Sequence, residues 1–388
     1  MNIIVFGGDH HNTLGVIRSL GRSGVMPDVL LHTRTSNTKK GLLKSKYINS
    51  FKIVSSCEEG VEYLKTICDE RKKQVIICTS DDASSIIDQN RDFLLKYFFI
   101  PGCEHQGDVT RLMNKKTMGE LASCVGFTIP RDVVVENRDI PSNVVYPCIT
   151  KPILSIDGNK NDIRVCNNHE ELATFLTKTE CLKFQLQQFI EKEFEYQLIG
   201  CSLDCGKTVI IPGRARIVSQ PLCTNTGFLK YEHLDGTEPI KECKRFLEKI
   251  SYSGLFSMEF LRGKDGNDYF MEINFRNDGN SICVTEAGVN LSYIWYAHCC
   301  NLDWHNKHKL DIKEIYVMPE FTEVGLWYTG DISFSRMIKE FRITNVYMDY
   351  SKDDPEPTNG KRDLLVCFCK YIVKKPLRTM LVYFGIKK

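Results

Sequence analysis

The sequence lacks the features of a protein that is stabilised by disulfide bonds or by structural zinc ions. None of its 17 cysteines forms a Cys-x-x-Cys pair, and the closest cysteine neighbours have no histidine at zinc-ligand spacing. Disulfide scaffolds are short and pair their cysteines, whereas this chain has 388 residues and an odd cysteine count. We therefore expect no disulfide framework and no structural zinc cluster, and we expect reduced cysteines that pack mostly as small apolar side chains.

Long apolar runs and a charge imbalance are missing as well. No window approaches the ~18–20 apolar residues that a membrane-spanning helix needs. The first residues lack the basic start, the apolar core and the cleavage site of a secretory signal. With 51 Lys+Arg against 49 Asp+Glu, the net charge is +2, so the chain lacks the excess of positive charge that is typical of nucleic-acid-binding proteins. We therefore expect a cytoplasmic protein without a nucleic-acid partner.

Short apolar segments alternate with helical stretches over the first hundred residues. Three segments have the apolar character of buried strands, namely residues 3–6, 29–31 and 75–78. This alternation predicts the fold class α/β, with a doubly wound parallel sheet in an amino-terminal domain of residues 1–105. Ligands of such sheets bind beyond the carboxyl ends of the strands, which here means near residues 7–11 and 79–82.

Mixed strands and helices follow this domain. Helical character covers residues 108–125, 169–177, 238–251 and 285–300, and strands are expected at residues 145–152 and 184–190. The pattern becomes weaker from about residue 309 onward. We therefore place a second domain at residues 106–310 and a small carboxyl-terminal extension at residues 311–388.

An acidic hairpin carries the strongest chemical signal in the chain. Two alternating segments flank an Asp-Gly turn, a pattern typical of a β-hairpin. Side chains two apart on a strand share a face, so Glu272, Asn274 and Arg276 point the same way, and Glu259 on the neighbouring strand can face them. Two carboxylates and an amide oxygen suit a hard cation such as Mg²⁺. The alternative interpretation is a solvated strand face.

This hairpin resembles the metal-binding hairpin of the ATP-grasp superfamily. Glu259 ends a Gly-x-x-x-x-Glu segment and precedes Glu272-Ile-Asn274 by thirteen residues, which is similar to the family's pattern. Further landmarks follow the family's order along the chain, namely Lys115, Lys151 in Thr-Lys-Pro, the hinge Gln188-Phe189-Ile190, and Glu195 seven residues after Gln188. The resemblance covers roughly residues 1–310.

The resemblance implies a two-lobed ATP-grasp fold with a lid at about residues 115–190, and ATP as the cofactor. It implies nucleotide contacts from Lys115, from Lys151, from the hinge of Gln188, Phe189 and Ile190, and from Glu195 at the ribose. It also implies one or two Mg²⁺ ions, with Mn²⁺ as an alternative, held by Glu259, Glu272 and Asn274. Arg276 and Arg216 are the residues it implies for stabilising charge on the transferring phosphoryl group. One departure is the loop of residues 155–162, which has one glycine and two aspartates where the family's lid loop is rich in Gly and Ser.

The family resemblance also implies a reaction class. A carboxylate–amine ligase of this type activates a carboxylate as an acyl phosphate and couples it to an amine, with release of ADP and phosphate. Residues 272–290 are most similar to D-aspartate ligase-like members, which suggests amino-acid ligation in cell-wall or capsular polysaccharide synthesis. Two alternatives stay open: a bicarbonate-activating enzyme like carbamoyl-phosphate synthase or biotin carboxylase, and a catalytically silent nucleotide-binding protein. The expected partners are small-molecule carboxylates and amines, and a homodimer is compatible with the sequence.

The turn after the first apolar segment has two interpretations. Gly7, Gly8 and Gly15 do not match the Gly-x-Gly-x-x-Gly spacing of dinucleotide sites. In ATP-grasp proteins a similar turn faces the substrate, which implies that His10 and His11 line an acceptor pocket. The other interpretation is a tight turn with histidines that face the solvent.

The carboxyl end is basic and amphipathic. Lysine and arginine interleave with apolar residues over residues 370–388, and no acidic residue follows Asp363. Such a stretch either docks on the body as a terminal helix or lies on an anionic membrane surface. We expect docking, because Pro376 should interrupt the helix.

Overall fold

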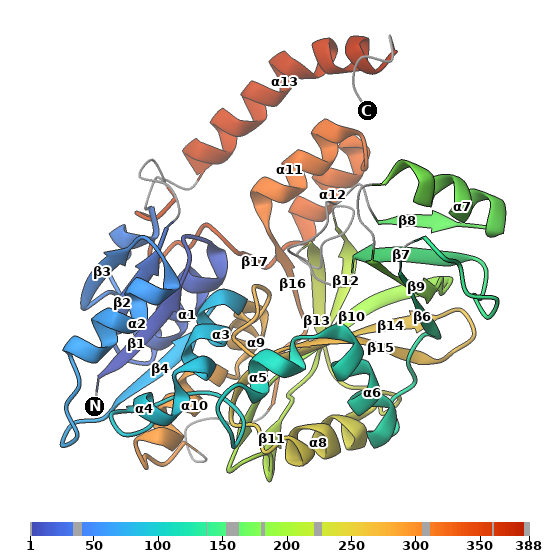
Figure 1. Cartoon of the computed structure of the whole chain (residues 1–388). Helices are drawn as coiled ribbons and strands as arrows, with labels where there is room; N and C mark the ends of the chain where they lie inside the picture. The colour runs from blue at the N-terminus through green and yellow to red at the C-terminus, as the bar shows by residue number, and fades with distance from the viewer. Residues whose placement is uncertain are drawn as a thin grey trace.

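Five parallel strands form the sheet of the amino-terminal domain (Figure 1). The computed structural model describes residues 2–33, 41–136, 138–152, 163–179, 183–220, 227–304, 311–358 and 361–383. The strand order is β3-β2-β1-β4-β5, and every neighbouring pair is parallel. The bounds in this domain are β1 Ile3–Gly7, α1 His11–Arg22, β2 Asp28–His32, β3 Ser50–Val54, α2 Cys57–Thr66, β4 Gln74–Cys78, α3 Asp81–Gln89, α4 Arg91–Leu94 and β5 Phe98–Phe99.

Alternating apolar side chains explain why helices cover both faces of this sheet. Phe6 of β1 points to the face covered by α2 and α3, where it packs in one core with Val61 and Ile87. Val5 points to the opposite face and packs in another core with Val16 of α1. Both faces of a parallel strand are buried in such a sheet, which accounts for its continuous apolar sequence. The expected doubly wound parallel sheet is confirmed.

The carboxyl ends of β1 and β4 lie side by side. The hydroxyl oxygens of Thr13 and Thr79 are 2.7 Å apart, and a side chain at Gly7 would collide with Thr79. Glycine is therefore required at this close approach. Ser80 begins the next turn and accepts a hydrogen bond from the amide of Ala83, which caps α3. The two turns that the sequence marks for ligand binding thus meet at one edge of the sheet.

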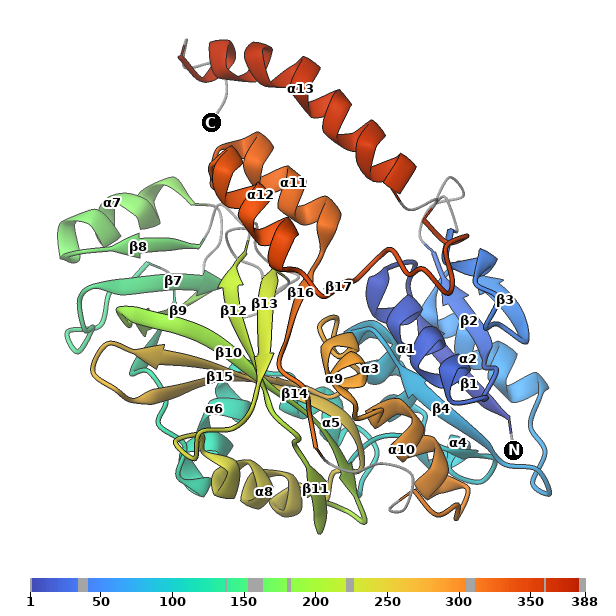
Figure 2. The same ribbon diagram turned by 180° about the vertical axis from the view of Figure 1, so that it is seen from behind.

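A four-stranded antiparallel sheet with one helix forms a separate small lobe (Figure 2). Its strand order is β6-β9-β7-β8, and apolar residues of α7 such as Phe175 pack on Phe184 of the sheet. The bounds are β6 Asp132–Glu136, β7 Cys148–Pro152, β8 Arg164–Cys166, α7 His169–Lys178 and β9 Lys183–Gln188. The loop of residues 155–162 lies outside the described residues.

The segment before this lobe belongs structurally to the large sheet. It contains α5 Asp108–Leu112 and α6 Lys115–Val125. Helix α6 packs against β15 and α8, and Met118 and Ala122 lie in the core of the large sheet. The small lobe therefore begins at β6, later than the expected lid boundary near residue 115.

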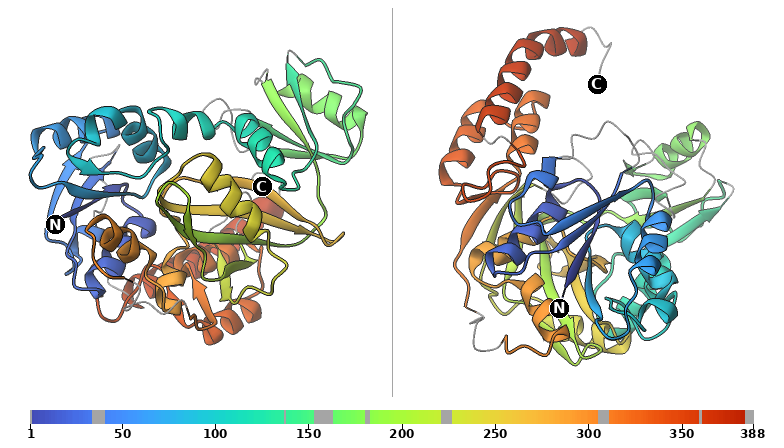
Figure 3. Two further views of the ribbon diagram at one scale, coloured as in Figure 1. Left: turned by 90° about the horizontal axis from the view of Figure 1, so that it is seen from below. Right: turned by 90° about the vertical axis from the view of Figure 1, so that its left-hand side faces the viewer.

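The large sheet has the strand order β15-β14-β10-β12-β13-β16-β17, with β11 paired to β10. Helices α6 and α8 cover one of its faces (Figure 3). On that face Phe246 of α8 packs in a core with Tyr196 and Phe260. The opposite face packs against α9 and α10 at one end and is open at the other. The bounds are β10 Lys192–Leu203, β11 Thr208–Ile210, β12 Arg214–Ser219, β13 Phe228–Glu232, α8 Ile240–Lys249, β14 Gly254–Gly263, β15 Asp268–Asn274, α9 Ile282–Ala287, α10 Leu291–Cys299, β16 Ile315–Met318 and β17 Val346–Tyr347.

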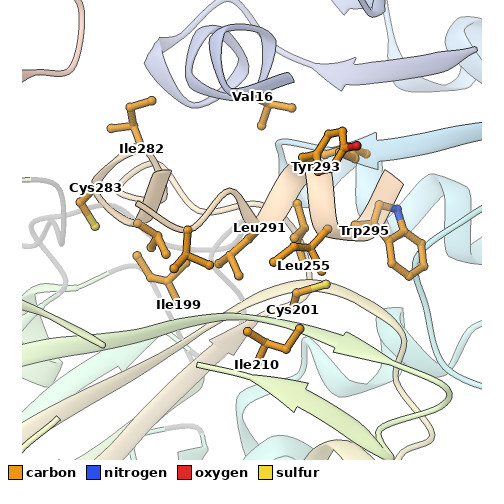
Figure 4. Close-up of a cluster of buried hydrophobic side chains, with 14 of the residues drawn as sticks. Val16, Ile199, Cys201, Ile210, Leu255, Ile282, Cys283, Leu291, Tyr293 and Trp295 are labelled. Carbon is orange, nitrogen blue, oxygen red and sulfur yellow. The ribbon is translucent and has the colours of Figure 1, made fainter. Parts of the chain in front are cut away.

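One hydrophobic core joins the amino-terminal domain to the large sheet. Figure 4 shows Val16 of α1 and Ile199 of β10 on opposite sides of α9 and α10, with Ile282 and Leu291 between them. The indole Nε1 of Trp295 also donates a hydrogen bond to the carbonyl oxygen of Ile76, at 3.2 Å. This continuous apolar contact fixes how the amino-terminal strand ends lie relative to the open face of the large sheet.

The segment after residue 310 is part of the body and not an appended extension. Strand β16 pairs antiparallel with β13, so this segment completes the large sheet. Farther on, Asp354 accepts a hydrogen bond from the Nε of Arg18 at 3.0 Å, which ties the chain back to α1. The remaining helices are α11 Glu320–Thr329, α12 Phe334–Ile343 and α13 Lys361–Tyr383. Helix α13 continues past Pro376 as far as Tyr383, which corrects the expected interruption.

Candidate active site

A cleft of about 2200 Å³ opens between the small lobe, the open face of the large sheet and the amino-terminal domain. Every site residue expected from the sequence lines this cleft except Arg216. The lining set comprises Lys115, Lys151, Gln188, Phe189, Ile190, Glu195, Glu259, Glu272, Asn274 and Arg276. The fold therefore brings together residues that are up to 161 positions apart in the sequence, from Lys115 to Arg276.

The acidic hairpin places two carboxylates opposite each other on the cleft side. Glu259 of β14 is paired directly with Glu272 of β15, whereas the next residue, Phe260, is paired with Phe270. Met271 is thus the extra residue of a β-bulge. Because of this bulge, Phe270 packs in the core opposite Phe260, whereas Glu272, two residues later, is opposite Glu259. The amide Nδ2 of Asn274 donates a hydrogen bond to Glu259 Oε1 at 3.0 Å.

Gln197 belongs to the same polar group, although the sequence analysis does not single it out. It is paired with Glu259 across β10 and β14, and its Nε2 donates to Glu259 Oε1 at 3.2 Å. Its own Oε1 accepts a hydrogen bond from Asn280 Nδ2 at 2.7 Å. The signal that could have found Gln197 is strand alternation, because it lies two residues after Glu195 and so shares the cleft face.

The electrostatics of this group fit a divalent cation. Burial raises the pKa of the Glu259 carboxyl well above its usual range, and the negative charges of Glu272 and Asp278 raise it further. A bound Mg²⁺ would remove this repulsion, and the oxygen donors present are those that Mg²⁺ prefers. Among the described residues no group of three or more His, Cys, Asp or Glu side chains could hold a metal ion. A Mg²⁺ ion at Glu259 and Glu272 would therefore need the Asn274 amide oxygen and the oxygens of a bound nucleotide as additional ligands.

Arg276 joins the acidic hairpin to the amino-terminal domain. Its Nε donates to Asp81 Oδ1 at 2.8 Å, and its Nη2 donates to Asn274 Oδ1 at 3.1 Å. Burial lowers the pKa of Arg276, but the charges of Asp81 and Asp278 outweigh this effect, so the net shift is upward. The guanidinium is therefore a permanent positive charge at the cleft, held in place by a carboxylate from another domain.

Two lysines approach the cleft from different elements. Lys151 of β7 is part of the small lobe, and its Nζ donates to Gln187 Oε1 at 2.7 Å. Lys115 is the first residue of α6, a helix capped by Asn114, whose Oδ1 accepts from the amides of Lys116 and Thr117. Both lysines thus bring a positive charge to the cleft.

The hinge segment connects the small lobe to the large sheet. The amides of Gln188 and Phe189 donate to the carbonyl oxygens of Arg131 and Pro147, at 2.7 and 2.8 Å, which holds the hinge against the small lobe. Ile190 follows them and lines the cleft. At the start of β10, Glu195 accepts hydrogen bonds from Gln220 Nε2 and Lys192 Nζ, both at 2.7 Å.

Arg216 lies on the wrong face of the large sheet for its expected role. It is paired with Tyr196, which is paired in turn with Phe260, and both aromatic residues belong to the core on the α6–α8 face of the sheet, whereas Glu259 points to the other face. The Nε of Arg216 donates to Glu232 Oε1 at 3.1 Å. Strand alternation thus directs Arg216 away from the carboxylates, which corrects its assignment to the phosphoryl site.

Histidines mark the amino-terminal edge of the cleft. His10 and His11 both line it, which agrees with the pocket interpretation of this turn. Withdrawal from water by the surrounding protein lowers the pKa of His10 to about 4, and the positive charges of His11 and Arg276 add to this effect. The His10 imidazole is therefore neutral at physiological pH and able to accept a proton.

A comparison of the sequence with protein-family models and with curated proteins finds no match. Solved structures, in contrast, match the fold over most of the chain. An N5-carboxyaminoimidazole synthetase from Staphylococcus aureus has a TM-score of 0.65 and 15% sequence identity, and the match covers 86% of each chain.

Two further structures have the same architecture. The L-amino acid ligase from Bacillus licheniformis has a TM-score of 0.60 and 12% identity, with 81% of this chain and 78% of that chain covered. The biotin carboxylase domain of the Hydrogenobacter thermophilus 2-oxoglutarate carboxylase has a TM-score of 0.61 and 17% identity, with 81% and 73% covered. These likenesses show that the chain has the ATP-grasp fold, as the sequence resemblance implies.

Proposed function

We propose that the chain is an ATP-dependent ligase that activates a carboxylate as an acyl phosphate and couples it to an amine, with release of ADP and phosphate. The observation that carries this proposal is the arrangement of the cleft. The paired carboxylates Glu259 and Glu272 lie on its floor, Lys151 lies on the small lobe, and the strand ends of the amino-terminal domain lie at its edge. A nucleotide and a small acceptor would therefore meet in one shared cleft.

The nucleotide would lie between the small lobe and the large sheet. Lys115 and Lys151 would bind phosphate oxygens, because both are cations that line the cleft. The first two hinge amides already bond within the chain, so Ile190 is the hinge residue we assign to the adenine edge. Glu195, held by Gln220 and Lys192, would accept hydrogen bonds from the ribose hydroxyls.

Glu259, Glu272 and Asn274 would hold one or two Mg²⁺ ions. A bound Mg²⁺ supplies neutralisation of charge on the β- and γ-phosphates during transfer. Gln197 would orient Glu259 through its hydrogen bond at 3.2 Å, and Asn280 would orient Gln197 in turn. The same residues accept Mn²⁺ by their chemistry, since carboxylate and amide oxygens also suit that ion.

Arg276 would stabilise the transferring phosphoryl group. A carboxylate oxygen of the substrate attacks the γ-phosphorus, and the bond to the β,γ-bridging oxygen breaks to release ADP. Negative charge spreads over the phosphoryl oxygens in this step, so a fixed cation is the group that lowers its barrier. Asp81 holds the Arg276 guanidinium in place before the substrate arrives, which avoids the cost of ordering it during the reaction.

The amino-terminal edge would receive the acceptor amine. The amine nitrogen attacks the acyl carbon, phosphate leaves with the electron pair of the broken bond, and the amine loses a proton. His10 is the residue we assign to accept that proton, because it lines the cleft at this edge and its imidazole has a ring nitrogen that can take up a proton. Dissociation of the amine proton before or during attack is required, since an ammonium group has no lone pair.

Bicarbonate is a second candidate for the activated substrate. The biotin carboxylase domain from Hydrogenobacter thermophilus was solved as a complex with MgADP and bicarbonate, and its fold matches 81% of this chain. The same chemistry would then give carboxyphosphate in place of an acyl phosphate. The likeness to an L-amino acid ligase favours an amino acid as the carboxylate instead.

The test is a screen for ADP release with the full chain, ATP and Mg²⁺. Amino acids and other carboxylates are supplied singly and in pairs with amines, and bicarbonate is supplied as a separate arm. We expect ADP release to depend on one carboxylate and one amine together, and a heavy-oxygen label in the carboxylate to appear in the released phosphate. Labelled phosphate from bicarbonate alone would select the second candidate. Failure of ATP to bind at all would overturn both.

A further inference from the structure

The last helix, α13, packs on the body through one face only. The ring of Phe368 lies 5.1 Å from that of Trp327, and the ring of Tyr371 stacks on that of Tyr328 at 4.4 Å. Leu364 and Cys367 complete this contact with α11. Figures 1 and 2 both show α13 along the outer edge of the molecule, beyond α11 and away from the large sheet. The docked side of α13 is therefore packed against α11.

The opposite side of α13 is apolar and exposed. Leu365 and Val366 are 61% and 56% exposed, and Ile372 and Val373 are 48% and 78% exposed. With about 3.6 residues per turn, Val366 and Val373 fall on the side of the helix turned away from Phe368 and Tyr371, whereas Leu365 and Ile372 lie at the border of that side, next to Phe368. All four side chains are apolar and exposed. We call them the outward face. A contiguous apolar stripe of this kind on a protein surface marks an interaction site.

Charge identifies the occupant of the outward face. Residues 364–388 contain six lysine or arginine residues and no aspartate or glutamate. Lys370 and Lys374 are exposed beside the outward face. A second copy of α13 would bring several like charges together, with only Asp363 of each copy to offset them. An anionic lipid surface, in contrast, offers both an apolar layer for the stripe and negative headgroups for the lysines.

We propose that the outward face of α13 docks on an anionic membrane surface, with the helix lying in the interface plane. No helix among the described residues is long and apolar enough to span a bilayer, so the contact is a surface contact. Helix α11 joins the docked helix to the cleft, because Asp331, two residues after α11 ends, is one of the cleft-lining residues. Membrane docking would thus hold the cleft in a defined orientation.

The experiment is flotation of the full chain with two kinds of vesicle, one of phosphatidylcholine alone and one of phosphatidylcholine and phosphatidylglycerol in equal parts. We expect binding to the anionic vesicles only, and weaker binding as the salt concentration rises. The double variant Val366→Asp/Val373→Asp places two carboxylates on the outward face, and it should lower the bound fraction by about tenfold or more. Both side chains are exposed, so the variant should melt at the wild-type temperature.

A matched control keeps the readout specific. Phe51 is an exposed apolar residue on β3 of the amino-terminal sheet, 54% exposed and outside α13, so Phe51→Asp should bind vesicles like the wild type. Equal binding of the double variant would overturn the proposal, as would absence of flotation with both vesicle types. A wild-type dimer in light scattering that the double variant converts to a monomer, without vesicle binding, would assign the outward face to a second copy instead.

Discussion

Glu259 and Glu272 are directly opposed across the β14–β15 ladder, in a group where burial and mutual repulsion raise the pKa of Glu259. This arrangement costs stability in the absence of a cation, because two carboxylates cannot both be charged at close range without compensation. Such local cost is typical of functional sites, where residues are arranged for a ligand and not for the free protein. The pair is therefore the first place to test the proposed chemistry.

Replacing Glu272 by glutamine should abolish turnover without unfolding the chain. The variant keeps the shape of the side chain but removes one of the two charges that would hold Mg²⁺, so we expect ADP release to fall by about a hundredfold or more. Addition of Mg²⁺ with ATP should raise the melting temperature of the wild type and not of the variant. Glu193→Gln is the control, since Glu193 is an exposed glutamate on β10 of the same sheet. Equal ADP release by Glu272→Gln would exclude this metal assignment.

Replacing Lys151 by alanine should weaken nucleotide binding. Its ammonium group lies at the cleft beside Gln187, and loss of one charge-assisted contact to a phosphate corresponds to about tenfold in affinity. Calorimetry of ATP binding measures this change directly. Lys183 is a matched control on β9 of the same sheet, because it pairs with Glu136 and is 59% exposed. An ATP affinity equal to that of Lys183→Ala would remove Lys151 from the nucleotide site.

Replacing Arg216 by glutamine should leave ATP binding and ADP release within about twofold of the wild type. Its guanidinium pairs with Glu232 on the face of the sheet that is turned away from the carboxylates. The paired variant Arg276→Gln should instead lower the rate of ADP release by about a hundredfold, because it removes the fixed cation at the cleft. A strong loss of turnover in Arg216→Gln, at normal melting temperature, would contradict the orientation of β12.

Replacing Arg18 by alanine should destabilise the fold by about 3 kcal/mol, since it leaves the buried carboxylate of Asp354 without its cation. The two side chains are 2% and 1% exposed, and the Nε of Arg18 lies 3.0 Å from Asp354 Oδ2. Arg22 is the control, because it makes a similar pair with Asp353 at the surface, 26% and 39% exposed. Arg22→Ala should cost less than about 1 kcal/mol. Urea unfolding measures both, and equal losses would show that Arg18 does not anchor this segment.

Replacing Glu323 by glutamine should stabilise the protein in alkaline buffer. Burial and the neighbouring Glu340 raise the pKa of Glu323, so the folded state holds this proton more tightly than the unfolded state does. Stability is then lost as the pH rises from the unfolded pKa through the folded one. At about pH 8 the glutamine variant should be more stable by about 1 kcal/mol or more, and near pH 4 the difference should vanish. Glu62→Gln, an exposed control, should show no such pH dependence.

The hairpin was predictable because its chemistry and its periodicity coincide in a short stretch. Alternation along one strand places Glu272, Asn274 and Arg276 on one face, and the Asp-Gly turn brings Glu259 to the neighbouring strand. The order of the lysines, hinge and carboxylates along the chain pointed to the same fold. The bulge at Met271 was not predictable, because no residue type is specific for it, and it places Phe270 and Glu272 on opposite faces against the simple alternation.

The sequence by itself determined the parallel amino-terminal sheet, the acidic hairpin and a set of candidate site residues that all line the cleft except Arg216. These features depend on local periodicity and on residue type, which are written along a single segment. Only the tertiary structure decided that Gln197 supports Glu259, that Asp81 holds Arg276, that Arg216 faces away, and that β16 completes the large sheet. Each of these depends on which distant strand or helix lies next to which. Which elements become neighbours depends on packing over the whole molecule, so it cannot be predicted from the sequence of any single segment.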